Sequence, residues 1–267
     1  MEIRKLIKNK ISDLFFYYSQ LQKDASIGCR ILMYHSIEES NSRLDKLGLA
    51  VPPETFYAQM KYLKESGFNV ISILELVDKI KNKLPLSTGS IAITFDDGYR
   101  SIFTNAYAAL KEFGFAATLF INIDFIENRV KDGQCWSSWP ALSWQEVDQL
   151  SGAGGLSIGS HALSHVRLGE LGVQQARHQI LESKRIIEDN IKEKVWAFSY
   201  PHGSFNGKIK RILQEGGFSC ACSSVEGISN LSSDIFALKR TEITSGDGII
   251  GFKKKISGSH DWIGCLR

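Results

Sequence analysis

The chain has 267 residues, of which 43% are hydrophobic and 23% charged, and it contains only five prolines. These values are close to globular averages, so they exclude a disordered or fibrous chain, and the length suits a single α/β barrel. The net charge of +3, from 32 basic and 29 acidic residues, is too small and too dispersed for a nucleic-acid-binding surface, which needs a concentrated basic face.

Residues 1–27 predict an amphipathic helix at the N-terminus. Lysines separate its apolar residues, which recur at helical spacing: Ile3, Ile7, Ile11, Leu14 and Tyr18. These apolar positions are too interrupted for a signal peptide or a membrane span. We expect the helix to cover an open end of the fold, with peripheral attachment to a membrane as the alternative. We therefore expect a cytoplasmic protein, located at the inner face of the membrane if the helix attaches there.

From residue 28 to residue 267 we expect one domain, in which short β-rich runs alternate with longer helical patterns. Eight strands are predicted, at residues 29–36, 68–73, 90–96, 116–124, 156–161, 195–201, 218–224 and 235–243. Helices are predicted between them, at residues 52–66, 72–82, 102–114, 143–154, 171–191 and 206–217. We expect the three lysines of "FKKKIS" near the end, Lys253 to Lys255, to form a charged face exposed to solvent. This alternation is typical of a (β/α) barrel with a mainly parallel sheet, whose functional residues lie at the carboxyl ends of the strands.

Two short motifs place chemistry-bearing side chains at those strand ends. In "TFDDG", Asp96 and Asp97 follow an apolar strand; alone, this pattern is also an ordinary Asp-Gly turn. In "SHALSHV", His161 and His165 are four residues apart, a spacing that on a helical turn brings both imidazoles to one side. A catalytic zinc site often has two histidines and one carboxylate. The motifs together therefore predict a metal site with a second aspartate left as general base.

These motifs, followed by "FSYPHG", resemble the polysaccharide deacetylase family, the carbohydrate esterases with a NodB-homology domain. The segments "ILMYHSI", "PPETFYAQMKYLKESGFNVIS" and "FSYPHGSFN" resemble the branch that includes poly-N-acetylglucosamine deacetylases. The similarity covers residues 28–245. It implies a deformed (β/α) barrel of the glycoside hydrolase/deacetylase type. It also implies metal-dependent removal of N-acetyl groups from the amino sugars of a polysaccharide, an oligosaccharide or a lipid-linked precursor.

The resemblance also implies a role for each matched residue. Asp96 corresponds to the catalytic base, and Asp97, His161 and His165 correspond to the ligands of Zn²⁺ or of another divalent metal such as Co²⁺ or Ni²⁺. The main-chain N–H of His202 corresponds to the donor to the oxyanion, while its side chain is expected only to line the groove.

Three departures from the family pattern concern the support of this site. Ser199 stands where many members carry an arginine that braces the base, so Arg240 is a candidate brace, with a surface or structural arginine as the alternative. Ala162 and Val166 replace the usual Ser or Thr and Pro of the histidine motif. No late segment matches the Leu-x-His motif of the leaving-group acid. His35, at the end of the first strand, is the candidate acid, with a hydrogen-bonded strand-end histidine as the alternative.

Other residues have two open interpretations. Aromatic side chains near the mouth could stack on sugar rings or pack in the core: Tyr99, Trp136, Trp139 and Trp144. The five cysteines match no metal or disulfide spacing, and Cys220 and Cys222 read as small apolar residues. The alternatives to a sugar deacetylase are a catalytically silent carbohydrate-binding barrel and an amidase of this fold that cleaves a non-sugar C–N bond.

Overall fold

The computed structural model describes residues 28–39, 45, 47–130, 139–151, 155–259 and 261. Within these residues, eight strands form one sheet: β1 (Cys29–Tyr34), β2 (Asn69–Val70), β3 (Ser90–Phe95), β4 (Ala117–Ile121), β5 (Ser157–Ser160), β6 (Ala197–Ser199), β7 (Cys220–Cys222) and β8 (Arg240–Glu242). All eight lie within the predicted ranges. The predicted N-terminal helix at residues 1–27 lies outside the described residues.

The sheet curls into a nearly closed barrel. Its order is β7-β6-β5-β4-β3-β1-β8, with β2 paired beside the start of β3, and every pairing between named strands is parallel. A parallel bridge between Cys222 and Leu238 joins β7 to the segment before β8 and brings the two edges together. The fold class expected from the sequence, a deformed (β/α) barrel, is therefore confirmed.

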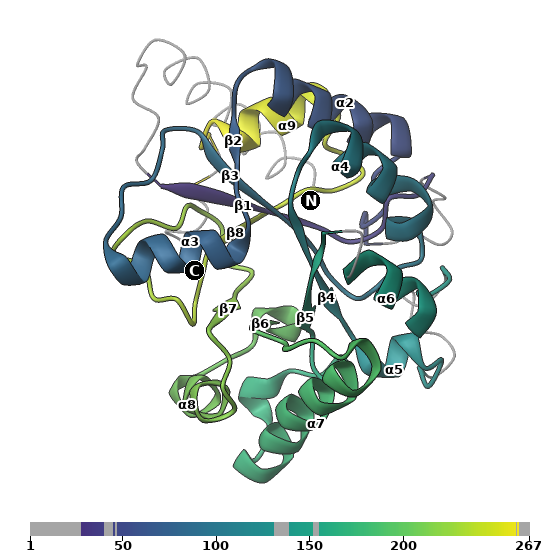
Figure 1. Ribbon diagram of the computed structural model, residues 1–267, viewed down its shortest axis with the longest axis vertical. Coiled ribbons are helices and arrows are strands. Elements are labelled where there is room, and N and C mark those ends of the chain that lie inside the picture. The colour runs from purple at the N-terminus through teal and green to yellow at the C-terminus, as the bar shows by residue number, and fades with distance from the viewer. Residues whose placement is uncertain are drawn as a thin grey trace, which may run out of the picture.

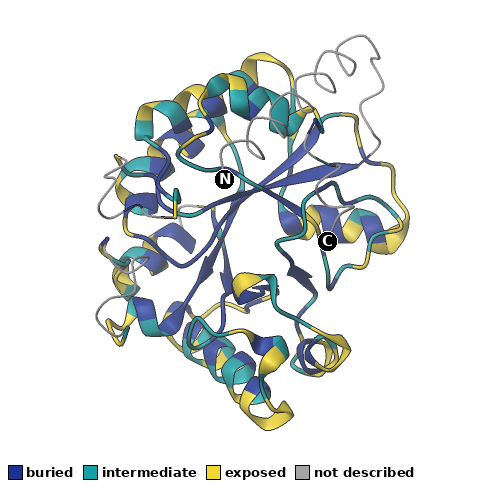
Figure 2. Cartoon of the chain, turned by 180° about the vertical axis from the view of Figure 1, so that it is seen from behind, coloured by how far each residue is buried: buried dark blue, intermediate teal, exposed yellow. Residues whose placement is uncertain are grey.

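Helices cover the outside of the barrel (Figure 1). They are α2 (Pro53–Glu65), α3 (Ile73–Asn82), the π-helical turn η1 (Ile102–Ala106) with α4 (Tyr107–Phe113), α5 (Ile123–Ile126), α6 (Trp144–Ser151), α7 (Val173–Ile191), α8 (Gly207–Glu215) and α9 (Ile249–Ile256), with short 3-10 turns η3 (Leu168–Glu170) and η4 (Pro201–Gly203). The buried residues form the strands and the inner helix faces (Figure 2). Within the described parts of the chain, no helix is long and apolar enough to cross a membrane.

Helix α3 closes the end of the barrel at which the strands begin. Its apolar residues pack in one cluster with Cys29, Ala197 and Cys220, the first residues of β1, β6 and β7. Residues 72–82 thus cover this end of the barrel.

Two helices were not predicted. Helix α5 has only four residues, too few to show periodicity. Helix α9 contains the lysine run, and Lys255 is not solvated as expected, because its ammonium contacts the Asp247 carboxylate and the Glu242 carbonyl. Phe252 of this helix is fully buried. The cysteine interpretation is confirmed for Cys220 and Cys222, which are buried thiols.

Candidate active site

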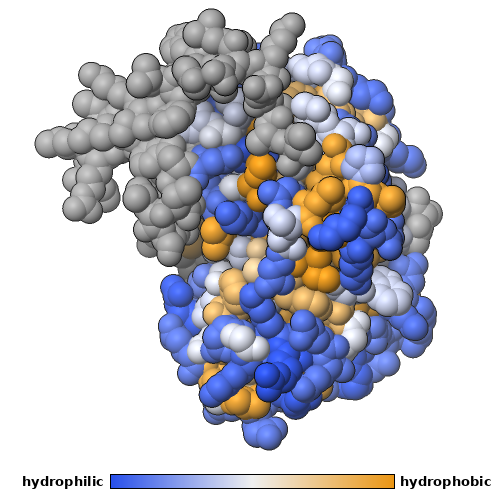
Figure 3. Space-filling view, turned by 90° about the vertical axis from the view of Figure 1, so that its left-hand side faces the viewer, coloured by the Kyte–Doolittle hydropathy of each residue, from blue (hydrophilic) through white to orange (hydrophobic). Residues whose placement is uncertain are grey.

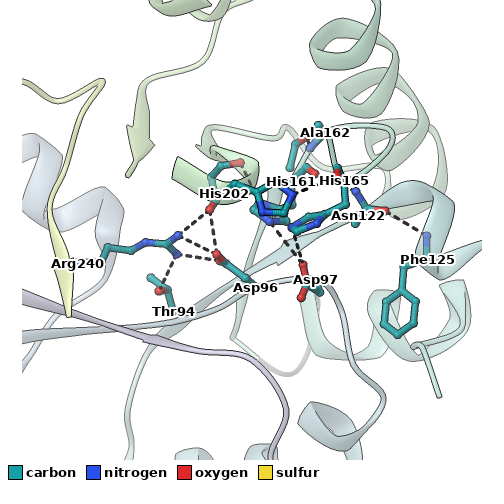
Figure 4. A network of polar contacts seen from close by, with 12 residues as sticks. Thr94, Asp96, Asp97, Asn122, Phe125, His161, Ala162, His165, His202 and Arg240 are labelled. Carbon is teal, nitrogen blue, oxygen red and sulfur yellow. Dashed lines mark hydrogen bonds and ion pairs between the residues drawn. The ribbon is translucent and has the colours of Figure 1, made fainter. Parts of the chain in front are cut away.

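The predicted site residues meet in one cleft at the carboxyl ends of the strands. Its volume is about 390 Å³, and its lining includes all six of them: His35, Asp96, Asp97, His161, His165 and His202. They follow β1, β3, β5 and β6, so their convergence results from the parallel direction of those strands. Figure 4 shows Asp97 facing His161 and His165, and Asp96 facing Arg240.

Asp96 continues the inward-facing register of β3, two residues beyond Thr94. Its side chain is buried and accepts two hydrogen bonds from Arg240, from Nη1 to Oδ1 at 2.8 Å and from Nη2 to Oδ2 at 2.7 Å. The Ser199 hydroxyl donates a third, 3.1 Å, to Oδ2. Burial by itself would raise the pKa of Asp96, but the Arg240 guanidinium holds the pKa well below its ordinary value. Asp96 is therefore ionised at neutral pH.

Arg240, the candidate brace of the sequence analysis, contacts Asp96 in the structure. It enters from β8, is 1% exposed, and also donates to the Ser223 carbonyl through Nε at 2.9 Å. Although burial opposes its charge, the Asp96 carboxylate raises the pKa of Arg240. Arg240 is therefore not a surface arginine, and its side chain holds the Asp96 carboxylate.

Asp97 turns away from Asp96 because the backbone reverses at this residue. Its φ of 74° lies in the left-handed region, which is unusual for a residue with a side chain, and Gly98 follows with a φ of 100°. A Cβ at Gly98 would lie 3.0 Å from Ile126 Cδ1 and 3.2 Å from Ile121 Cγ2, so these side chains would have to shift to admit it. The turn predicted at "DDG" is thus present, and it directs the two carboxylates to different partners.

The donor atoms of Asp97, His161 and His165 all lie within 4.8 Å of one another. Asp97 Oδ1 is 3.5 Å from His161 Nε2 and 3.6 Å from His165 Nε2. The two histidines are not on a helical turn, as their spacing had predicted, because residues 161–166 form an irregular loop. The loop is held by Gln179 of α7, whose side-chain oxygen accepts from the Ser164 backbone N–H at 2.8 Å.

The protonation of His161 leaves a nitrogen lone pair facing Asp97. His161 Nδ1 lies 2.8 Å from the Ser199 carbonyl, which can only accept, so Nδ1 carries the proton and Nε2 does not. Burial lowers the pKa of His161 to about 4 and that of His165 to about 3. Both imidazoles are therefore neutral at pH 7, as metal ligands must be.

These residues fit a divalent metal ion. Among the described side chains, Asp97 Oδ1 is one of the few buried polar atoms without a hydrogen-bond donor. Burial raises the pKa of Asp97, and the neighbouring histidines offset only part of this rise. A cation bound here would neutralise the buried charge of Asp97 and give its Oδ1 a partner. Two imidazole nitrogens and one carboxylate are a donor set that suits zinc, cobalt or nickel.

Asn122, which sequence reasoning missed, links the backbone of Asp97 to the backbone of His161. Its backbone N–H donates to the Asp97 carbonyl at 3.0 Å, and its side-chain amide donates to the His161 carbonyl at 3.1 Å. Its side-chain oxygen caps α5 by accepting from Phe125 N–H at 3.2 Å. An Asn at the end of a β-rich run before a short apolar segment is a helix-capping signal that could have indicated it.

The sequence also matches a known protein family. A family model described as polysaccharide deacetylase matches residues 83–221, more than half of the chain. The chain belongs to the polysaccharide deacetylase family. It is therefore a carbohydrate N-deacetylase, a hydrolase of a carbon–nitrogen bond.

Relatives and solved structures agree with this family. The chain is 28% identical over 216 residues to YxkH of Bacillus subtilis, which is named as a polysaccharide deacetylase, covering 81% of this chain and 71% of that one. It is 25% identical over 224 residues to the poly-β-1,6-N-acetyl-D-glucosamine N-deacetylase of Staphylococcus epidermidis, covering 80% and 73% of the two chains. Streptococcus pyogenes deacetylase PplD has the same fold, with a TM-score of 0.75 at 22% identity over 86% of this chain and 98% of that one.

In this deacetylase, His35 extends the inward-facing positions of β1, two residues beyond Met33, and lines the cleft. Its Nδ1 is buried, and no hydrogen-bond partner for it is found in the described part of the chain. The alternative of a strand-end histidine held through Nδ1 is therefore not supported. The acid role of His35 stays a prediction.

His202 has a left-handed backbone, with φ 56° and ψ 16°, at the rim of the cleft. Its ring centroid lies 4.3 Å from that of His165, and its Nε2 lies 3.4 Å from the His165 carbonyl. The side chain thus lines the groove and covers one ligand of the candidate metal site, as expected. The oxyanion role of its main chain stays a prediction.

The aromatic side chains expected near the mouth are packed against other apolar residues, and none of the three that the structure describes lines the cleft. Tyr99 is fully buried, and its ring lies 5.1 Å from Phe125 and 6.2 Å from Trp139, centroid to centroid. Trp144 is half-buried against the main core. The packing interpretation is therefore correct for these three, while Trp136 lies outside the described residues.

Proposed function

We propose that this protein is a metal-dependent N-deacetylase that hydrolyses N-acetyl groups of amino sugars in a polysaccharide, an oligosaccharide or a lipid-linked precursor. One observation carries the proposal: a buried carboxylate held by an arginine lies next to an Asp-His-His ligand set in a single cleft. The resemblance to poly-N-acetylglucosamine deacetylases supports an acetylated amino sugar as substrate.

In this proposal, Asp97, His161 and His165 would hold the metal. A divalent ion bound there would polarise the acetyl carbonyl and lower the pKa of a bound water. Asp96, which Arg240 keeps ionised, accepts the proton of the attacking water. Ser199 and Arg240 occupy Asp96 Oδ2, and Arg240 also occupies Oδ1, so the carboxylate cannot rotate away from the cleft.

Two further residues complete the reaction. The main-chain N–H of His202 donates to the oxyanion that forms on the acetyl carbonyl. His35 donates a proton to the nitrogen of the sugar as the C–N bond breaks, so that the products are acetate and a free amine. Its position at the end of β1, lining the same cleft as Asp96, supports this role.

Release of free amine from N-acetylglucosamine oligomers of several lengths tests the proposal. Metal-stripped protein, with and without added Zn²⁺, Co²⁺ or Ni²⁺, should show turnover only when a metal is present. A panel of non-sugar amides and cyclic imides, assayed in parallel, distinguishes an amidase of the same fold. Metal-loaded protein that binds the oligomers but releases no amine would be a catalytically silent carbohydrate-binding barrel.

The location of the protein is a separate proposal. The sequence favours the cytoplasm, with the inner face of the membrane as the variant in which residues 1–27 attach to lipid. Hydrophilic side chains surround smaller apolar groups on the face seen in Figure 3. Fractionation of cells that express the full chain, followed by immunodetection in the soluble and membrane fractions, tests this location.

A further inference from the structure

Ser199 is the last residue of β6 and lies between the two functional parts of the cleft. Its side chain is fully buried. It faces the barrel interior, as Ala197 does two residues earlier, and both of its polar groups are used. The hydroxyl contacts the base, and the carbonyl contacts a metal-ligand histidine.

The contacts of the hydroxyl fix its direction. Arg240 can only donate, so the 2.8 Å contact between its Nη2 and Ser199 Oγ makes the hydroxyl oxygen an acceptor. The hydroxyl hydrogen is then directed to Asp96 Oδ2, 3.1 Å away. Without the hydroxyl, the Asp96 carboxylate would lose a donor and Arg240 would lose an acceptor, both in a buried site where water does not easily replace them.

The carbonyl of the same residue fixes His161. By accepting from Nδ1 at 2.8 Å, it determines the tautomer and the orientation of the ring, and so directs Nε2 toward Asp97. Because the hydroxyl and the carbonyl belong to one residue of a buried strand, a shift of Asp96 relative to His161 would have to break one of these contacts.

We propose that Ser199 is a positioning residue that sets the distance and direction between the base Asp96 and the metal ligand His161. This inference rests on the proposed function. The hydroxyl is the part that a substitution can remove, since the carbonyl remains in every variant. Loss of the hydroxyl should therefore weaken the chemical step and leave metal binding and substrate binding nearly unchanged.

The test compares Ser199→Ala, Ser199→Thr and a matched control, Ser90→Ala. Ser90 is also a buried strand serine, but it lies at the opposite end of the barrel, and its hydroxyl donates to the Ser87 carbonyl at 2.7 Å. In amine-release assays, we expect Ser199→Ala to lower kcat roughly 10- to 100-fold, the loss typical of a hydrogen bond to a charged group, with KM and zinc affinity within about threefold of the wild type. Ser199→Thr, which keeps the hydroxyl, should recover most of kcat, and Ser90→Ala should behave as the wild type.

A second measurement does not depend on activity. In metal-free protein, a double-mutant cycle on urea unfolding of Ser199→Ala and Asp96→Asn should show a coupling of about tenfold in the unfolding equilibrium constant. Additive effects, or a Ser199→Ala enzyme with the kcat of Ser90→Ala, would overturn the inference. A drop in zinc affinity that matches the drop in kcat would also overturn it. Absence of amine release from the wild type would refute the proposed function instead, and the cycle would still test Ser199.

Discussion

Arg240 and Asp96 are 144 residues apart in the sequence, yet they form a two-point ion pair in the buried centre of the barrel mouth, at 2.8 and 2.7 Å. Both side chains are less than 5% exposed. The pair crosses from β8 to the end of β3, two strands that are both neighbours of β1. Its geometry leaves the carboxylate ionised and fixed in direction, which is what a general base beside a metal ion requires.

Removal of this brace should affect both stability and activity. Arg240→Met leaves the Asp96 charge buried without its partner, so we expect the free energy of unfolding to fall by about 3–5 kcal/mol. Urea unfolding of metal-free protein measures this loss. The double variant Arg240→Met/Asp96→Asn removes the charge as well and should recover part of the stability. If Arg240→Met were as stable as the wild type, the pair would not be the buried ion pair described here.

Asp96 and Asp97 should lose different properties when each is changed. Asp97→Ala removes a ligand, so zinc affinity should fall at least about 100-fold, and activity with it. Asp96→Ala keeps the three ligands, so the protein should still bind zinc while kcat falls roughly 100- to 10,000-fold, the range for a general base. Equilibrium dialysis against zinc and the amine-release assay separate the two. Loss of metal in both variants would make Asp96 a ligand rather than the base.

The free energy of unfolding of the metal-free protein should decrease as the pH falls from 7 toward 4. The pKa values of His161 and His165 are lowered from 6.5 to about 4 and about 3 in the folded state, so the unfolded chain binds protons first as the pH falls. The stability that depends on the two neutral histidines is fully present above pH 6.5. Below that pH it is lost progressively, because protons then bind to these histidines in the unfolded chain. We expect the free energy of unfolding to fall by about 3–5 kcal/mol between pH 7 and pH 4.5.

Urea titrations at several pH values measure this loss. His165→Gln, which cannot take up a proton, should reduce the slope to about that of one histidine, and bound zinc should suppress it. An unfolding free energy that stays constant between pH 7 and pH 4.5 would show that these histidines are not buried in the neutral form.

His35 should matter most when the leaving group needs a proton. His35→Asn removes the acid, so we expect kcat on an N-acetylglucosamine oligomer to fall about 100-fold or more. Hydrolysis of 4-nitrophenyl acetate, whose leaving group departs as an anion, should fall by less than about threefold. Equal losses on both substrates would assign His35 to binding or to structure.

Much of the barrel follows from the sequence because its strands and long helices have strong local patterns. All eight strands and six helical segments were predicted, since apolar runs such as residues 90–95 and periodic segments such as residues 173–191 carry their own signals. Helix α5 was missed because four residues show no period, and α9 because its lysine run suggested a solvated face. Lys255 is partly buried because its ammonium contacts Glu242 and Asp247, two residues that lie outside the helix.

The chemistry of the site was predictable as residue types and strand-end positions, but its geometry was not. The spacing of His161 and His165 predicted a helical turn, whereas a loop held by Gln179 of α7 brings the two rings together. The support by Asn122 depends on hydrogen bonds to the backbone of Asp97 and His161, which have no pattern in the chain.

By itself, the sequence determined the fold class, the strand that ends just before Asp96 and the donor set of Asp97, His161 and His165, because these depend on local periodicity and on residue type. Only the tertiary structure decided that Arg240, and not a residue near Pro201, holds the Asp96 carboxylate, and that Ser199 lies between Asp96 and His161. The physical reason is that a buried charge needs a partner in space, and the closing of the barrel, not the order of the chain, brings β8 and β6 to the end of β3.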